Sequence, residues 1–351
     1  MFIIICRKGI SQINEIDAPK ENIKELWKTF NDRYANFDLK EVDWNEMYKK
    51  YSILINEKTT NEELFEVCCE MLQELNDGHV TIEPNFKEIN IECGPPYEFL
   101  HDIEFGSDSE LQKFNDVIDQ ELEKSGFSKA VKTELTEGSN FQYRLSKLYG
   151  YLRLDEMTEK ITFGKFQKTI DKAINAFKNK KGLIIDLRFN GGGWDHHSYK
   201  LASRFVSVGE VSHFERKRIK GTIEYSKFKE KKVKPGGKIQ FTKPIVILTS
   251  DYTASAAEVF VLLMKELPNV TIIGDNTEGI FSDMYFFKLP NKWRVSLSNQ
   301  QYFSNDKKNY EGIGIPPDIK IVNSRLDIKN NHDPVIKEAI NHLNNKTTAN
   351  N

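Results

Sequence analysis

The sequence has few cysteines, no excess of basic residues and no long hydrophobic run. Four cysteines in 351 residues are too few for a fold built on disulfides. Lys and Arg number 50 against 52 Asp and Glu, and the resulting net charge of −2 argues against a partner that is a nucleic acid or an anionic membrane. No run approaches the ~20 apolar residues of a membrane span. The composition is that of an enzyme-sized globular protein.

The chain opens on an apolar stretch, residues 1–6, which has no basic start. It is shorter than the ~7–15-residue apolar core of a signal peptide. We therefore expect a short strand there and slightly favour the cytoplasm. The alternative is the remnant of an export signal, which would favour an exported or periplasmic protein, so the compartment stays open.

Helical periodicity dominates the amino-terminal part of the chain. Apolar residues recur at helical spacing over 20–36 and again around 44–51. A third helix is predicted from Thr60, because Thr60 and Glu63 form a capping-box pattern. It should end at residues 76–78, and residues 79–82 are typical of a strand. We therefore predict that 1–83 is a helical segment that ends in a strand.

The next region, residues 84–146, is poorly patterned. It contains a polar helix near 108–125, and we interpret it as a connecting region or insert without a recognisable PDZ domain. From residue 147 apolar strands alternate with amphipathic helices, which predicts a parallel sheet with right-handed crossovers. The predicted strands cover 149–154, 182–188, 244–248 and 270–273, and the helices cover 163–177, 193–205 and 255–267.

Three further predictions concern the rest of this part of the chain. Residues 211–240 are basic and should form an exposed excursion with little strand. A hairpin is expected over 284–297, and Asp333-Pro334 should begin a final helix with a capping Asp. The predicted core therefore covers 147–343, and the polar end, 344–351, is expected to be a frayed tail.

Chemically suggestive residues follow two of the predicted strands, where sites form in open parallel sheets. Consecutive glycines at 191–193 let the backbone approach a substrate and aim N–H groups at it. After the next strand, Ser255 stands at an apparent helix start, where the helix dipole stabilises negative charge. Taken alone, the glycines are typical of a tight turn and Ser255 of an N-cap.

Together, these segments resemble peptidase family S41, the tail-specific protease and tricorn-core group. Four strings carry the resemblance in the family's order: LIIDLRFNGGG (183–193), TASAAE (253–258), IGDNTEG (273–279) and GIPPD (314–318). Trp27, VDW (42–44) and LNDGHV (75–80) look like the helical segment before the protease core in tricorn-like members. The resemblance covers roughly 20–83 and 147–340. It implies an α/β fold with a ClpP/crotonase-like core, a parallel sheet and flanking helices behind an amino-terminal helical segment.

The resemblance also discriminates between the two catalytic designs of the family. One branch uses a Ser–Lys dyad, but residues 277–281 contain no Lys where that branch has it. The other branch uses a His and a Glu, which match His79 and Glu311 here. The resemblance therefore implies Ser255 as nucleophile, His79 as general base and Glu311 as the carboxylate that orients His79.

The implied function is a serine endopeptidase that cleaves peptides or unfolded protein segments. The N–H groups of Gly192 and Ala256 would form the oxyanion hole. No cofactor, metal or nucleotide is expected. An extended substrate would add a strand at a sheet edge, and a homo-oligomer is left open. Asp195, His196 and His197 resemble metal ligands, but neighbouring histidines point apart, so we expect Asp195 to cap a helix instead.

Two alternatives remain. The first is a catalytically inactive family member that binds peptides or apolar ligands, in which His79 is an ordinary strand histidine and Glu311 a solvated charge. The second is an acyl-CoA enzyme on the related crotonase-like architecture, which needs a basic, apolar groove and no Ser–His–Glu set. Labelling of Ser255 by an active-site serine reagent separates both from a peptidase.

Overall fold

The computed structural model describes residues 18–84, 93–94, 107–133, 141–157 and 162–348. The strand expected at 1–6 lies outside the described residues. The chain forms two compact units. Unit 1 comprises Met1–Pro96, Arg218–Tyr225 and Asp283–Gln300, and unit 2 comprises the remaining segments. The domain boundaries expected at residues 83 and 146 stay a prediction.

Unit 1 packs helices against a small antiparallel sheet. Its helices are α1 (Pro19–Arg33), α2 (Phe37–Lys40), α3 (Trp44–Ser52) and α4 (Asn61–Gln73). The sheet has the order β1-β11-β10, with β1 (Thr81–Glu83), β10 (Met284–Lys288) and β11 (Arg294–Ser298). The predicted amino-terminal helices, the capping box of α4 and the hairpin are confirmed.

Burial of one apolar face per element holds unit 1 together. Helix residues such as Leu26 and Leu72 share a core with Val295 and Leu297 of β11. A disulfide between Cys69 and Cys93, which the sequence did not indicate, adds a covalent link. The Cys93 N–H also donates to the Ile82 carbonyl of β1 at 3.2 Å. Cys93 is therefore tied both to α4 and to β1.

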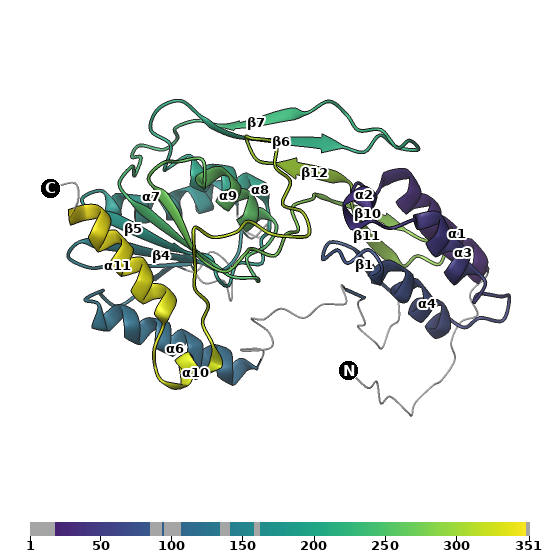
Figure 1. Cartoon of the computed structure of the whole chain (residues 1–351), viewed down its shortest axis with the longest axis horizontal. Coiled ribbons are helices and arrows are strands. Elements are labelled where there is room, and N and C mark those ends of the chain that lie inside the picture. Colours follow the sequence, from purple (N-terminus) through teal and green to yellow (C-terminus); the bar gives the residue numbers. More distant parts are fainter. Residues whose placement is uncertain (1–17, 85–92, 95–106, 134–140, 158–161, 349–351) are drawn as a thin grey trace. The chain divides into compact units, whose positions relative to one another are not determined.

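Unit 2 is built on a seven-stranded sheet of the order β13-β9-β8-β5-β4-β3-β2. Its strands β4 and β5 are labelled in Figure 1. The neighbours from β13 to β4 run parallel, and β3 and β2 add antiparallel. The strands are β2 (Val131–Thr133), β3 (Phe141–Leu145), β4 (Tyr149–Leu154), β5 (Gly182–Asp186), β8 (Ile245–Thr249), β9 (Val270–Gly274) and β13 (Ile319–Lys320). The predicted α/β class with a mostly parallel sheet is confirmed.

Helices cover both faces of this sheet (Figure 1). One face packs against α7 (Phe163–Phe177), α8 (Asp195–Ala202) and α9 (Ala256–Met264). The other packs against α6 (Asp108–Lys124), α10 (Arg325–Lys329) and α11 (Pro334–Thr348). Central strands are thus buried on both sides, which is why β5 and β8 read as apolar runs. α11 continues to Thr348, so the tail expected to fray from 344 is helical over its described part.

The prediction of a strand-poor excursion at 211–240 is wrong. β6 (Val211–Lys217) and β7 (Lys229–Val233) pair antiparallel, and with β12 (Gln300–Phe303) they form a sheet of the order β12-β6-β7. β6 hides its strand pattern because polar His213 and Glu215 occupy buried positions. β7 is an edge strand in this sheet, and exposed lysines are common on edges because they oppose further pairing.

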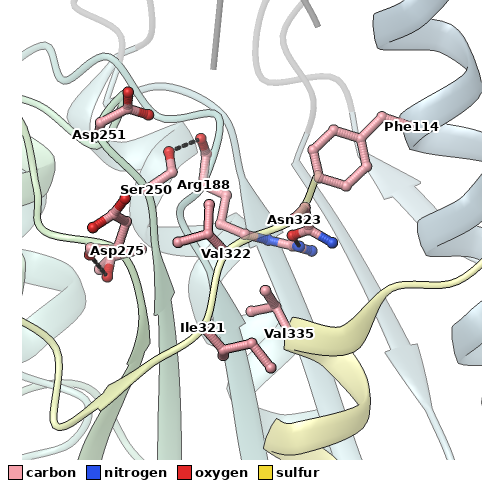
Figure 2. Close-up of a pocket in the computed structure, with 10 residues that line it drawn as sticks. Phe114, Arg188, Ser250, Asp251, Asp275, Ile321, Val322, Asn323 and Val335 are labelled. Atoms are coloured by element: carbon pink, nitrogen blue, oxygen red, sulfur yellow. Dashed lines mark hydrogen bonds between the residues drawn. The ribbon is translucent and has the colours of Figure 1, made fainter. Parts of the chain in front are cut away.

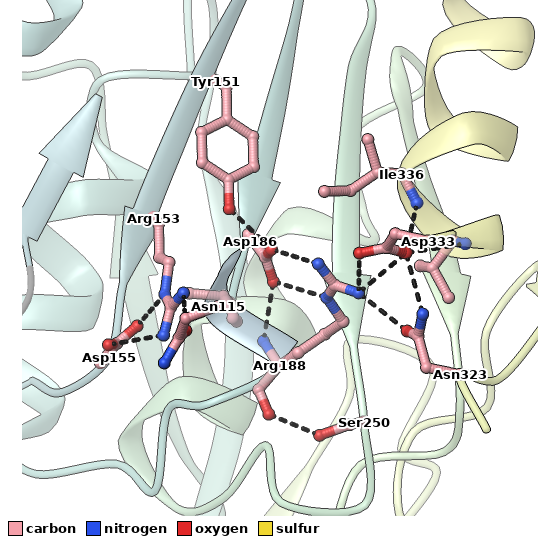
Figure 3. A network of polar contacts seen from close by, with 12 residues as sticks. Asn115, Tyr151, Arg153, Asp155, Asp186, Arg188, Ser250, Asn323, Asp333 and Ile336 are labelled. Carbon is pink, nitrogen blue, oxygen red and sulfur yellow. Dashed lines mark hydrogen bonds and ion pairs between the residues drawn. The ribbon is translucent and has the colours of Figure 1, made fainter. Parts of the chain in front are cut away.

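A buried polar network joins the end of β5 to the start of α11 (Figure 3). The Arg188 guanidinium donates to Asp186 at 2.7 and 2.9 Å, to Asp333 at 3.0 Å and to Asn323 at 2.8 Å. Burial alone raises the pKa of Asp186, but Arg188 outweighs it and holds that pKa below its usual value. Asp333 caps α11 as predicted, accepting from the N–H groups of Val335 and Ile336. The network holds the chain just before the three consecutive glycines, residues 191–193.

Candidate active site

Ser255 has a backbone conformation that L-residues rarely adopt. It immediately precedes α9 with φ of 52° and ψ of −119°, in a region disfavoured by contacts of the Cβ atom. Strain of this kind persists only where the surroundings over-determine it, and it concentrates at functional sites. The partly exposed Ser255 also lies at the positive end of the α9 dipole. A negative charge on its oxygen would therefore be stabilised.

The turn before Ser255 is tied to the chain that follows β5. The Thr253 hydroxyl donates to the Leu187 carbonyl at 3.0 Å, and the Ala254 N–H donates to the Asn190 carbonyl at 3.0 Å. The Ser250 hydroxyl donates to the Arg188 carbonyl at 2.7 Å. The carboxyl ends of β5 and β8 therefore hold the serine turn and the glycine segment together.

Gly192 lies directly against the serine turn. A Cβ atom added to it would lie 2.7 Å from Ser255 Cβ and 3.1 Å from the Ala256 nitrogen, and its φ is +100°. Only glycine fits there. The structure thus brings together three of the predicted site residues: Ser255, Ala256 and Gly192. The Gly192 N–H, however, donates to the Asn190 side chain at 2.9 Å, a contact that the sequence did not indicate.

Glu258 is buried on the first turn of α9 and accepts four hydrogen bonds. Its Oε2 accepts from the N–H groups of Ser255 at 3.0 Å and Ile280 at 2.9 Å. Its Oε1 accepts from the Thr277 hydroxyl at 2.5 Å and the Gly279 N–H at 2.8 Å. Burial raises the pKa of Glu258 to about 7, although the four donors oppose the rise. The 277–281 segment therefore turns the N–H groups of Gly279 and Ile280 to this carboxylate.

Glu311, the predicted orienting carboxylate, is 6% exposed. Its Oε2 accepts the Phe281 N–H at 2.9 Å, and its own N–H donates to the Asn309 side chain at 2.8 Å. The next residue, Gly312, donates its N–H to the Gly279 carbonyl at 2.7 Å. Glu311 is therefore fixed to the same 277–281 segment that Glu258 holds.

His79 belongs to unit 1, where its backbone is held by polar side chains. Its N–H donates to Asp77 at 2.9 Å, and its carbonyl accepts from the Ser296 hydroxyl of β11 at 2.8 Å. The Tyr34 hydroxyl donates to the other Asp77 oxygen at 2.8 Å. Asp77 and Ser296 thus hold the backbone of His79, and the sequence analysis assigned a role to neither residue.

The helix-capping prediction for Asp195 is wrong. Asp195 does not cap α8, because Trp194 is the N-cap residue and Asp195 is the first helical residue. The Asp195 carboxylate instead accepts from the Tyr302 hydroxyl at 2.9 Å. Within the described part of the chain, no cluster of His, Cys, Asp or Glu has the arrangement of a metal site. No helix in those ranges is long and apolar enough to cross a bilayer.

A small cavity of about 30 Å³ lies at the carboxyl ends of β8 and β9 (Figure 2). Arg188, Ser250, Asp251 and Asp275 are among its lining residues. That volume suits a water molecule or two. None of the predicted site residues lines the cavity. We therefore assign the candidate site to the serine turn and not to this cavity.

Comparison with known proteins identifies two matching family models. Residues 148–321 match "Peptidase family S41", and residues 17–73 match "Tricorn protease C1 domain". The chain is 30% identical over 183 residues to the carboxy-terminal-processing protease of Bartonella bacilliformis, covering 51% of this chain and 40% of that protein. It is also 30% identical over 155 residues to the carboxy-terminal processing protease CtpA of Bacillus subtilis, covering 44% and 32%.

A solved structure agrees with these matches. A putative peptidase from Parabacteroides merdae superposes with a TM-score of 0.76 at 26% identity, covering 93% of this chain and 96% of that one. The chain spans only 40% and 32% of the two curated relatives. The two family models fall on the amino-terminal helices and on the core, as the sequence motifs predicted. The chain therefore carries a peptidase S41 family domain over residues 148–321, preceded by a tricorn protease C1 domain over residues 17–73.

Proposed function

We propose that this chain is a serine endopeptidase with Ser255 as its nucleophile. The observation that carries the proposal is the backbone of Ser255, which is strained, lies at a helix N-terminus and packs against Gly192. A serine that only caps a helix does not need this strain, whereas a nucleophile gains from being held with its oxygen turned to substrate. Family membership supports the same reaction class.

In the proposed mechanism His79 takes the proton of the Ser255 hydroxyl as its oxygen attacks the scissile carbonyl. His79 then gives that proton to the leaving amine, and the carbon–nitrogen bond breaks to leave an acyl-enzyme. Water repeats the sequence: His79 accepts its proton, and the hydroxide attacks the ester carbonyl. The bond between the acyl carbon and Ser255 Oγ then breaks, and His79 returns the proton to Ser255 as the acid product leaves. Glu311 would hold the His79 ring and stabilise its charged form.

The tetrahedral oxyanion would be held by the N–H groups of Ala256 and Gly192. Ala256 is the first residue of α9, so its N–H lies in the orphan first turn of the helix. Gly192 packs beside it. Because the Gly192 N–H donates to Asn190 here, we expect the oxyanion to replace or share that bond when substrate arrives. The substrate would be an extended peptide or unfolded segment that pairs with a sheet edge.

Cleavage of an unfolded protein tests this function. Ser255→Ala and His79→Ala should each lower kcat by at least about a thousandfold, because each removes a group that reacts. Glu311→Gln should lower kcat by about a hundredfold or more, since an amide does not stabilise the imidazolium. His196→Ala on α8 serves as the control and should cleave as fast as wild type. Unchanged cleavage by Ser255→Ala would overturn the proposal.

One observation favours a second candidate, an inactive family member that binds peptides. The bond from the Gly192 N–H to Asn190 occupies one of the two oxyanion donors. In such a protein, Ser255→Ala would bind an unfolded polypeptide as tightly as wild type, and neither would cleave it. Cleavage by wild type and its loss in Ser255→Ala exclude this candidate.

A further inference from the structure

The strongest unassigned feature is Glu258, which is fully buried yet carries a carboxylate. Burying an ionisable group is costly unless hydrogen bonds satisfy it. Here all four bonds come from donors: three backbone N–H groups and one hydroxyl. The Thr277 hydroxyl is committed to donate, because its oxygen accepts the Ile315 N–H at 2.7 Å. The surroundings of Glu258 are therefore built for an acceptor.

Helix capping accounts for only a part of this arrangement. In a capping box, the third helical residue accepts the N–H of the N-cap residue, as Glu258 does for Ser255. The other three donors lie 19 to 22 residues further along the chain and play no part in starting α9. An exposed Glu would serve a cap equally well. The burial of Glu258 thus reflects its link to the 277–281 segment.

That segment also holds Glu311. Phe281 donates its N–H to the Glu311 carboxylate, and Gly279 accepts the Gly312 N–H. A Cβ atom added to Gly279 would lie 2.7 to 3.0 Å from the nitrogens of residues 312–314, so the two segments are in close backbone contact. One continuous set of bonds therefore runs from the Ser255 backbone through Glu258 and the 277–281 segment to Glu311.

We propose that Glu258 is a positioning residue that sets the strained backbone of Ser255 in register with the segment holding Glu311. Its Oε2 accepts a hydrogen bond from the Ser255 N–H. This bond opposes relaxation of Ser255 out of its positive-φ conformation. The same oxygen holds Ile280, the neighbour of the residue that binds Glu311. This inference rests on the proposed peptidase function, because it assigns Glu258 a task in that reaction.

The test uses Glu258→Gln, which preserves size but exchanges one acceptor oxygen for an NH2 group. That group would meet two donors, so the serine turn or the 277–281 segment must move. A displacement of about 1 Å at a reacting group lowers rates about a hundredfold. We expect kcat for an unfolded substrate to fall about a hundredfold, with KM within about threefold of wild type. Glu266→Gln, just beyond α9, is the matched control and should leave both constants unchanged.

A second measurement separates positioning from stability. The rate constant for modification of Ser255 by a small fluorophosphonate reports the nucleophile without peptide binding. It should fall about as much as kcat in Glu258→Gln, when corrected for the folded fraction. Glu258→Asp keeps the charge but is one methylene short of its partners, so it should fold and still react at least about tenfold more slowly.

The outcomes distinguish this inference from the function on which it rests. If Ser255→Ala cleaves like wild type, the peptidase proposal fails. If Ser255→Ala is inactive while folded Glu258→Gln and Glu258→Asp modify and cleave at wild-type rates, only the role of Glu258 fails. Should Glu258→Gln not fold, the modification rate of Glu258→Asp decides: a slower rate supports positioning, and a wild-type rate overturns it.

Discussion

Two helices in this chain begin with the same sequence pattern and differ in almost every physical respect. Thr60 and Glu63 begin α4, and Ser255 and Glu258 begin α9. At α4 the N-cap residue has φ of −74° and ψ of 170°, as N-caps usually do, and Glu63 is exposed. At α9 the N-cap residue has φ of 52°, and Glu258 is buried.

The difference shows what a strained helix start requires beyond a capping box. At α4 the two hydrogen bonds of the capping box need no other residue, because the side chains of Thr60 and Glu63 each accept the other's backbone N–H. The pair at α9 depends on distant parts of unit 2, because the 277–281 segment holds Glu258 and Gly192 crowds Ser255. Strain is stored only where tertiary contacts enforce it.

The largest expected difference concerns activity. Ser255→Ala should lower the rate of peptide cleavage by at least about a thousandfold, whereas Thr60→Ala should leave the rate of folded protein unchanged. The reason is that the proposed mechanism assigns the nucleophile to Ser255 and no reacting group to Thr60. Initial rates on an unfolded protein substrate measure the effect. Equal cleavage rates for the two variants would show that Ser255 is no more important for activity than Thr60.

The second-largest expected effect comes from crowding Ser255 at the start of α9. Gly192→Ala places a Cβ atom 2.7 Å from Ser255 Cβ at a φ of +100°, so the serine turn must shift. We expect cleavage to fall about a hundredfold, because a shift of about 1 Å suffices for that. Gly164→Ala in α7 is the control, since its Cβ atom meets nothing within 4 Å. A fully active Gly192→Ala would contradict the packing described here.

Burial of Glu258 predicts a pH dependence of stability. Its pKa rises from 4.5 to about 7 on folding, so the folded protein binds this proton more tightly than the unfolded chain. The stabilisation is present below pH 4.5 and is lost as the pH rises through 7, a change of about 3 kcal/mol. Urea unfolding of wild type and Glu258→Gln at pH 5 and pH 8 measures it, because Gln does not titrate. If the free energy of unfolding of wild type, relative to that of Glu258→Gln, rose with pH instead, the four hydrogen-bond donors would outweigh the effect of burial on the pKa of Glu258.

The smallest effects are opposite in sign at the two helix starts. Ser255→Gly should raise the free energy of unfolding by about 1 kcal/mol, because glycine tolerates a positive φ. Thr60→Ala should lower it by about 1 kcal/mol through loss of the cap. Thermal unfolding of both variants tests the pair. A destabilised Ser255→Gly would mean that the Ser255 backbone is not strained.

Patterns that are local in the sequence predicted most of the fold. The capping box of α4, the apolar runs of β5 and β8 and the 284–297 hairpin each depend on neighbouring residues, and each was confirmed. β6 and β7 were not predicted because they contain many polar residues and lack the apolar alternation typical of a strand. The disulfide was missed because Cys93 lies 24 residues from Cys69, in a region without pattern.

In the candidate site too, local motifs were predictable and contacts between distant residues were not. Motif order located Ser255, Gly192 and Ala256, and the structure brings these three together. His79 and Glu311 as partners of Ser255 stay a prediction. The bond between Gly192 and Asn190 and the four donors around Glu258 depend on tertiary packing, which spacing along the chain does not encode. The sequence therefore indicated candidate site residues, but not the contacts that hold them.

The proposed mechanism depends on Ser255 acting as a nucleophile that His79 activates. Mass spectrometry of the full-length protein after treatment with a fluorophosphonate tests it most directly. We expect one covalent adduct on Ser255 in wild type, formed at least about a hundredfold more slowly in folded His79→Ala. No adduct on Ser255 of folded wild type, or the same rate in both proteins, would contradict the account.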